Sequence, residues 1–174
     1  MFAVWLIVIS CGKGKPIISS QYGPLLDTWE TRNSKVTIRV RKFQEKDPVF
    51  LHHFLYVFDS SMIETNTWRD IMTVRQNDDR PIPRDQVHFL EGDIVYLFMN
   101  SKFAVTTDRG GTWSVWDAAD ELRDWHQSYV YIQEANIDAD GSGRLSLLPF
   151  PDSKASAPVF ETTDYGRHWF PKQQ

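Results

Sequence analysis

Apolar and polar residues alternate along much of this chain, which is the period-two pattern of β-strands with one buried face. The clearest strand-like segments are residues 36–40, 49–58, 93–99, 103–106 and 112–116. One further segment, residues 118–125, has a helical composition, with Asp117 as a candidate N-cap and acidic residues in its first turn. The pattern therefore predicts a mainly β protein of antiparallel sheets, with one short helix inserted near residues 118–125.

An eight-residue pattern occurs twice among these segments. Residues 106–113 read Thr-Thr-Asp-Arg-Gly-Gly-Thr-Trp, and residues 162–169 read Thr-Thr-Asp-Tyr-Gly-Arg-His-Trp. Both copies share Thr-x-Asp-x-Gly-x-x-Trp in register, and we call them the first and the second repeat. A recurrence of this kind points to repeated structure before it points to chemistry.

Each shared residue type has a structural role in a tight hairpin. An Asp accepts hydrogen bonds from the backbone N–H groups of the turn, and a Gly takes a positive φ without steric cost. The Thr hydroxyl adds a local hydrogen bond, and the Trp buries a large apolar face. The residues expected in these roles are Thr106, Asp108, Gly110, Thr112 and Trp113 in the first repeat, and Thr162, Asp164, Gly166 and Trp169 in the second.

The two repeats resemble the Asp-box, also called the BNR repeat. The first repeat matches Ser/Thr-x-Asp-x-Gly-x-Thr/Ser-Trp at every defined position, and the second departs from it only at His168. In that family the box lies on the hairpin between the third and fourth strands of a β-propeller blade, away from the catalytic face. The resemblance implies a propeller-like fold but no particular activity, because Asp-boxes occur in sialidases, sortilin-like receptors, photosystem assembly factors and secreted binding proteins.

The spacing of tryptophans indicates how many blades the chain can hold. Trp29, Trp68, Trp113 and Trp169 lie 39, 45 and 56 residues apart, close to the roughly 40–50 residues of a four-stranded blade. Residues 61–68 keep the first Ser and the final Thr-Trp of the box, whereas Trp29 keeps only the tail. Ordinary core packing is the alternative interpretation of both. Closure of a propeller takes at least four blades. We expect about three to four blades, in a ring that is either closed or incomplete, with a twisted multi-sheet β domain as the alternative.

The N-terminus resembles a bacterial lipoprotein signal. Residues 1–10 are almost wholly apolar, and they precede Cys11, the one cysteine of the chain, in a lipobox-like string at residues 8–11. The resemblance implies cleavage before Cys11, lipidation of its thiol and an outer-membrane lipoprotein on the periplasmic face of the bacterial cell envelope. Residues 11–24 would then form a tether and residues 25–174 a single Asp-box β domain. The alternative is a buried first strand with Cys11 as a core residue.

Composition narrows the classes of partner. The formal net charge of −4 and the isoelectric point of about 5.7 give no electrostatic basis for binding nucleic acid. No run of eighteen or more apolar residues is present to span a membrane as a helix. We therefore expect contact with the membrane only through the lipid anchor.

The sequence carries no recognisable reaction centre. It has no Gly-x-Ser-x-Gly elbow or phosphate-binding glycine loop, and its histidines lack metal-ligand spacing. Residues 138–143 resemble the start of a calcium loop, but the twelfth position is Pro149 rather than Glu, so a hairpin turn is favoured. A sialidase would need an arginine triad and a longer chain. We expect no catalytic residue, no metal and no cofactor.

The resulting hypothesis is a noncatalytic exported lipoprotein that binds another protein, in the manner of an immunity protein or an inhibitor. The expected contacts are Trp116, Trp125 and the polar, proline-bearing loop at residues 77–85. Core packing is the alternative role of the two tryptophans. Two other functions remain open: a carbohydrate-binding or sialidase-like, glycosidase-related protein, and an assembly factor for a membrane complex.

Overall fold

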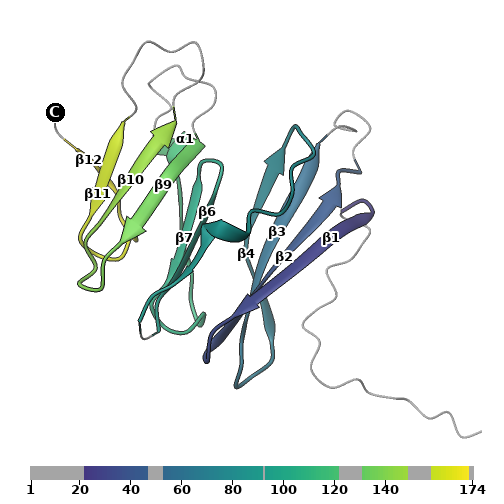
Figure 1. Ribbon diagram of the computed structural model, residues 1–174, viewed down its shortest axis with the longest axis horizontal. Coiled ribbons are helices and arrows are strands. Elements are labelled where there is room, and N and C mark those ends of the chain that lie inside the picture. The colour runs from purple at the N-terminus through teal and green to yellow at the C-terminus, as the bar shows by residue number, and fades with distance from the viewer. Residues whose placement is uncertain (1–21, 47–52, 92, 122–130, 149–157, 173–174) are drawn as a thin grey trace, which may run out of the picture.

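The computed structural model describes residues 22–46, 53–91, 93–121, 131–148 and 158–172. Within these residues the chain forms three four-stranded antiparallel sheets and one short α-helix. The sheets follow one another in a row, in the order of the sequence, as Figure 1 shows. The prediction of a mainly β protein with antiparallel sheets is confirmed. No helix in this part of the chain is long and apolar enough to cross a membrane.

Sheet A is a meander of four long strands. They are β1 (Leu25–Arg32), β2 (Val36–Gln44), β3 (Phe54–Met62) and β4 (Trp68–Gln76), hydrogen-bonded in that order. The alternation in β2 explains its two faces, since Val36, Ile38 and Val40 are fully buried while Arg39 and Arg41 project from the opposite side. The valine and isoleucine side chains face sheet B.

Sheet B lies in the middle of the row and is built from shorter strands. A 3-10 turn, η2 (Arg84–Gln86), leads into β5 (Val87–Phe89), β6 (Val95–Met99), β7 (Lys102–Thr106) and β8 (Ser114–Asp117). The helix α1 (Ala118–Glu121) follows, and Oδ1 of Asp117 accepts the N–H of Ala119 at 3.0 Å. The predicted short helix is therefore present. The residues beyond Glu121 into which it was expected to continue lie outside the described residues.

Sheet C completes the row with β9 (Tyr131–Ile137), β10 (Gly143–Leu148), β11 (Val159–Thr162) and the two-residue β12 (Phe170–Pro171). The strands β9 and β10 pair directly across the turn at residues 138–142. Gly141 takes a φ of +88° there, which a residue with a side chain adopts only with strain. This segment is thus the hairpin turn that the sequence favoured over a calcium loop.

Two apolar cores hold the three sheets together. Sheets A and B bury Ile38, Phe58 and Leu97 between them, and sheets B and C bury Phe103 and Leu145. Sheet B is therefore covered on both faces, which explains why all five residues of β6 are buried. The sequence left open whether the ring is closed or incomplete, and no closed propeller is observed within the described residues.

The two outer faces of the row differ in character. On sheet A, Asp59 lies only 1% exposed and accepts hydrogen bonds from Arg41 at 2.8 and 2.9 Å and from Arg39 at 3.2 Å. On sheet C, the exposed side chains include Glu134 and Arg144. The first outer face buries an ionic group, whereas the second presents charges to solvent.

Candidate functional site

The first repeat forms the hairpin between β7 and β8, and its Asp side chain is committed to its own turn. Asp108 accepts the backbone N–H of Thr112 at 2.8 Å and the Thr112 hydroxyl at 2.7 Å. The Thr106 hydroxyl donates to Asp108 at 2.8 Å and accepts the N–H of Gly110 at 2.9 Å. Gly110 has a φ of +81°. These hydrogen bonds outweigh partial burial and lower the pKa of the Asp108 carboxyl.

The second repeat forms the equivalent hairpin between β11 and β12. Asp164 accepts the N–H of His168 at 3.0 Å, and the Thr162 hydroxyl bridges Asp164 and the N–H of Gly166 at 2.8 and 3.0 Å. His168, the one departure from the Asp-box pattern, keeps the side-chain contact as well, because its Nδ1 lies 2.5 Å from Oδ2 of Asp164. Imidazole thus replaces hydroxyl at the same carboxylate oxygen.

Both repeats also pack against the preceding sheet. The indole N–H of Trp113 donates to the buried Ser60 hydroxyl of β3 at 2.9 Å, which links sheet B to sheet A. Trp169 packs edge-on against Phe103 of β7 with ring centroids 5.1 Å apart, which links sheet C to sheet B. The side chain of Arg167 hydrogen-bonds the hydroxyl of Thr107 across the same boundary. The repeats therefore join neighbouring sheets as well as closing their own turns.

Residues 61–68 and Trp29, which keep only parts of the Asp-box pattern, differ in their positions in the fold. Residues 61–68 connect β3 to β4, the third and fourth strands of sheet A, which is the position that the two repeats occupy in sheets B and C. Asn66 has a positive φ of 48° there, one position after the place that the glycine takes in the two repeats. Trp29 instead lies within β1 and packs toward the core between sheets A and B, so it does not belong to a hairpin of this kind.

The structure places the residues that were predicted to contact a partner in different environments. Trp116 is only 9% exposed and packs against Phe160 and Trp169 in the core between sheets B and C. Trp116 is thus a core residue, which corrects its assignment as a contact residue. Trp125 and Cys11, together with the signal-like residues 1–10 and most of the tether, lie outside the described residues. The loop at residues 77–85 lies on the surface and borders a hollow among the described residues.

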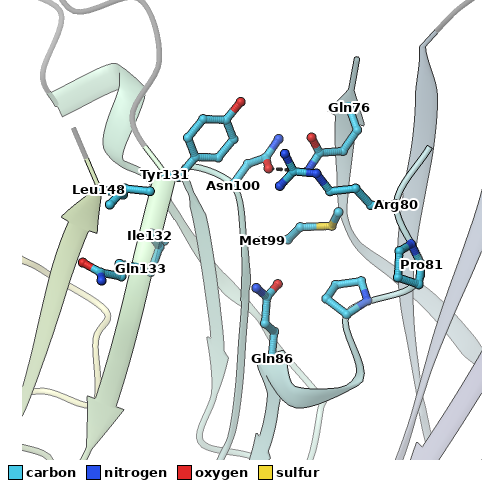
Figure 2. Close-up of a pocket in the computed structure, with 11 residues that line it drawn as sticks. Gln76, Arg80, Pro81, Gln86, Met99, Asn100, Tyr131, Ile132, Gln133 and Leu148 are labelled. Carbon is cyan, nitrogen blue, oxygen red and sulfur yellow. Dashed lines mark hydrogen bonds between the residues drawn. The ribbon is translucent and has the colours of Figure 1, made fainter. Parts of the chain in front are cut away.

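This hollow is a pocket of about 480 Å³ at the ends of the sheets opposite the repeats. Its eleven lining residues are Gln76, Arg80, Pro81, Pro83, Gln86, Met99, Asn100, Tyr131, Ile132, Gln133 and Leu148. Strand pairing explains its location: Met99 pairs with Lys102 at one end of β6–β7, while Val95 pairs with Thr106, where the first repeat begins. Figure 2 shows the loop after β4 on one wall and β9 on the other.

The centre of the pocket is lined by side-chain amides. Gln76 donates to Oδ1 of Asn100, and Nδ2 of Asn100 donates to the carbonyl of Arg75 at 3.0 Å. Asn100 holds its place in the β6–β7 turn with a φ of 55°, a conformation that asparagine tolerates better than most residues. Within the described chain, Oε1 of Gln86 is buried and accepts no hydrogen bond. A buried acceptor without a donor is a free-energy cost that a ligand's N–H removes.

The loop wall is fixed from beneath by two buried polar side chains of sheet A. The carbonyl of Arg80 accepts hydrogen bonds from Nζ of Lys42 at 2.6 Å and from the Tyr56 hydroxyl at 2.5 Å. Lys42 also pairs with Asp79. Burial lowers the pKa of the Lys42 ammonium, but its hydrogen bond to Asp79 and its contact with Tyr56 more than offset this and raise the pKa. The ammonium is therefore charged, and it positions the loop backbone.

The Arg80 side chain is the one formally charged group among the lining residues. Its Nε donates to Asp78 at 2.6 Å, and this hydrogen bond raises the pKa of the guanidinium. In Figure 2 the side chain extends from the loop into the pocket, toward Asn100. Tyr131 and Ile132 lie on the facing wall, so a guanidinium, amides and an apolar surface border the same space.

This set of groups is suited to recognition. None of the eleven lining residues carries a carboxylate, an imidazole or a thiol, the groups that most often transfer protons or attack a substrate. In the described ranges, no cluster of three His, Cys, Asp or Glu side chains is placed to hold a metal ion. Of the lining residues, the sequence singled out only the loop at residues 77–85; the others lie too far apart in the chain to form a motif.

Comparison with protein-family models, with curated proteins and with solved structures gives no match for this chain.

Proposed function

We propose that this protein is a noncatalytic binding module that holds another protein at the pocket on the sheet ends opposite the repeats. The observation that carries the proposal is the composition of that pocket, in which one guanidinium and neutral amides surround an apolar floor. Three sheets contribute to it, so its shape depends on the whole row. An inhibitor or an immunity protein is one form that such a module takes.

The two repeats support this assignment because their aspartate side chains are engaged within their own turns and are not available to a ligand. The carboxylate oxygens of Asp108 and Asp164 accept hydrogen bonds from residues of their own turns. The hairpins of the repeats lie at one end of the sheets, and the loops that border the pocket lie at the other. In many β proteins a rigid scaffold positions surface loops that carry the binding residues. The surface loop at residues 77–85 is the part of the pocket that the sequence pointed to as a contact.

We further propose that the three sheets are blades of an Asp-box, propeller-like domain. The support is that each repeat joins the third and fourth strands of its sheet, as the resemblance implies, and that residues 61–68 do the same in sheet A. An experimental structure of the full chain in which the sheets do not fan about a common axis would contradict this.

The proposed location is the periplasmic face of the outer membrane of a bacterial cell, to which a lipid on Cys11 would anchor the protein. Its support is the sequence alone: the apolar residues 1–10 followed by the lone cysteine. Labelling with radioactive palmitate in a bacterial host tests the proposal, because label should enter the unaltered chain and be absent from Cys11→Ser. Equal labelling of the two chains contradicts lipidation at this residue.

A carbohydrate ligand is the second candidate, and the phenol ring of Tyr131 beside several amides favours it. Aromatic faces and amide groups are well suited to stack on and hydrogen-bond a sugar ring. A glycan array separates the two candidates. Saturable binding of a glycan that is lost in Tyr131→Ala would replace a protein partner by a sugar.

Photo-crosslinking in the native host tests the leading proposal. We place p-benzoylphenylalanine at Tyr131, on the pocket wall. The control position is Phe170, an aromatic residue that follows the second repeat and is 63% exposed. A dominant protein should be crosslinked from position 131 and be absent from position 170. Crosslinking of that protein from position 170 alone would place the binding surface elsewhere and contradict the proposal.

A further inference from the structure

We infer that the pocket receives a carboxylate of the partner protein, held by the terminal nitrogens of Arg80. The carboxylate is a chain end or an acidic side chain with an apolar side chain beside it. The inference rests on the proposed function, because it names the part of the partner that enters the pocket.

Charge is the first reason for a carboxylate. Arg80 carries the only formal charge among the eleven lining residues, and its Nε is occupied by Asp78 at 2.6 Å. Within the described residues its two terminal nitrogens have no hydrogen-bond partner. A guanidinium donates two parallel hydrogen bonds to a carboxylate, and this pairing is both stronger and more specific than a neutral hydrogen bond.

The position of Arg80 is the second reason, because it is prepared before the ligand arrives. Its carbonyl accepts from Lys42 at 2.6 Å and from Tyr56 at 2.5 Å, and the latter two side chains are 7% and 0% exposed. Pro81 restricts the next backbone torsion. A receptor group whose backbone is already fixed loses less conformational entropy on binding.

The remaining lining groups describe what accompanies the acid. Oε1 of Gln86 is buried without a donor, so an N–H of the ligand has an acceptor within the pocket. Met99 and Ile132 are 4% and 5% exposed and form an apolar floor, and Leu148, 48% exposed, adds an apolar side chain nearer the solvent. A peptide segment supplies all three complements together: a carboxylate, an amide N–H and an apolar side chain.

The single cation also argues against a phosphate group. A phosphate ester carries a charge between −1.5 and −2 near neutral pH and is usually held by several donors or cations. The pocket offers one guanidinium, and Asp78 beside it opposes a second negative charge. A singly charged carboxylate matches this arrangement better.

A titration of the full, isotope-labelled chain followed by NMR tests the inference. The probes are N-acetyl-leucine, which carries a carboxylate, and N-acetyl-leucinamide, its neutral counterpart. We expect N-acetyl-leucine to shift the side-chain amide signals of Gln76, Gln86 and Asn100 with saturation, at a dissociation constant at least about tenfold below that of N-acetyl-leucinamide. Inorganic phosphate should shift these signals less than N-acetyl-leucine does.

Three variants distinguish the role of Arg80 from that of general charge. Arg80→Gln should weaken binding of N-acetyl-leucine by about tenfold, whereas Arg84→Gln, an exposed arginine of the same loop that does not line the pocket, should leave it unchanged. Asp78→Asn should strengthen it, because a competing negative charge is removed. Backbone spectra of the variants report whether each remains folded.

Several results would overturn the inference. Equal shifts from the acid and the amide, preferential binding of phosphate, or unchanged binding in a folded Arg80→Gln would each exclude a carboxylate at Arg80. A protein crosslinked from position 131 together with any of these results would leave the proposed function intact and remove only the carboxylate. A selective shift by N-acetyl-leucine without a crosslinked protein would indicate a small organic acid as the ligand and contradict both statements.

Discussion

The Nδ1 atom of His168 lies 2.5 Å from Oδ2 of Asp164, in the place that the Thr112 hydroxyl takes beside Asp108. The departure from the Asp-box pattern therefore conserves a contact while changing the residue. Asp164 retains a lowered pKa: its partial burial acts in the opposite direction, and the hydrogen bonds from His168 and Thr162 outweigh it. We therefore expect the stability of the hairpin to depend on the carboxylate more than on the side chain that contacts it.

This relationship predicts unequal effects of substitution. His168→Thr should change the free energy of unfolding by less than about 0.5 kcal/mol, because a hydroxyl restores the contact at an exposed site. Asp164→Ala should lower it by about 1–2 kcal/mol, because the N–H of His168 and the Thr162 hydroxyl lose their acceptor. Urea unfolding measures both, and a greater loss from His168→Thr than from Asp164→Ala would contradict this account.

Gly166→Ala should destabilise the protein by about 2–3 kcal/mol, from strain and overpacking together. Gly166 has a φ of +82°, and an added Cβ would lie 2.6 Å from Cε1 of Phe103 in the neighbouring sheet. Gly111→Ala is the matched control, since this residue has no positive φ and its added Cβ meets Asp108 at 3.1 Å. Equal losses in thermal or urea unfolding would show that the neighbouring sheet does not matter.

Ser60→Ala should lower the free energy of unfolding by about 1–3 kcal/mol, because the indole N–H of Trp113 loses its partner. Ser146→Ala, on the outer face of sheet C, should have almost no effect. In a Trp113→Phe background the cost of Ser60→Ala should largely disappear, because no N–H then needs an acceptor. A double-mutant cycle without coupling would exclude a bond between the two sheets at this point.

The buried carboxyl of Asp59 leads us to predict that the free energy of unfolding depends on pH. Burial raises the pKa of its carboxyl from 3.8 to about 6, against the opposing effect of Arg41 and Arg39. The folded protein thus holds this proton more tightly than the unfolded chain does. The contribution is fully present below pH 3.8 and is lost as the pH rises through about 6, so this group lowers the free energy of unfolding across that range.

Urea unfolding between pH 3.5 and 7 tests this sign. Asp59→Asn should remove a decline on the order of 2–3 kcal/mol across that range, while Asp85→Asn, an exposed aspartate of η2, should keep it. A slope that is identical in the unaltered chain and Asp59→Asn would mean that the buried carboxylate stays ionised throughout.

The fold elements that depend on local chemistry could be predicted from the sequence. A turn rich in Asp, Gly and Thr determines its own geometry, which is why both repeats and the turn at residues 138–142 were located correctly as hairpins. Residues 61–68 show the limit of this approach. They occupy the same position without Asp or Gly, and Asn66 provides the left-handed residue.

The parts that depend on long-range packing could not be predicted. Alternation in β8 puts Val115 and Trp116 on opposite faces, but only the approach of sheet C decides that Trp116 is buried and Val115 remains 47% exposed. The pocket presents the same difficulty, because Gln76, Asn100 and Tyr131 meet only after three sheets have stacked. No spacing in the sequence indicates that these three residues lie close together.

The charges on the outer face of sheet C have a consequence for assembly. Among the described residues no further sheet covers the outer faces of sheets A and C. Head-to-tail contacts between such faces that do not close into a ring can extend into a fibre. Glu134 and Arg144 are exposed on that face, and stacking another copy over them would strip away their water at a cost in free energy. Glu134 and Arg144 are therefore expected to oppose the stacking of another copy of the protein on the outer face of sheet C.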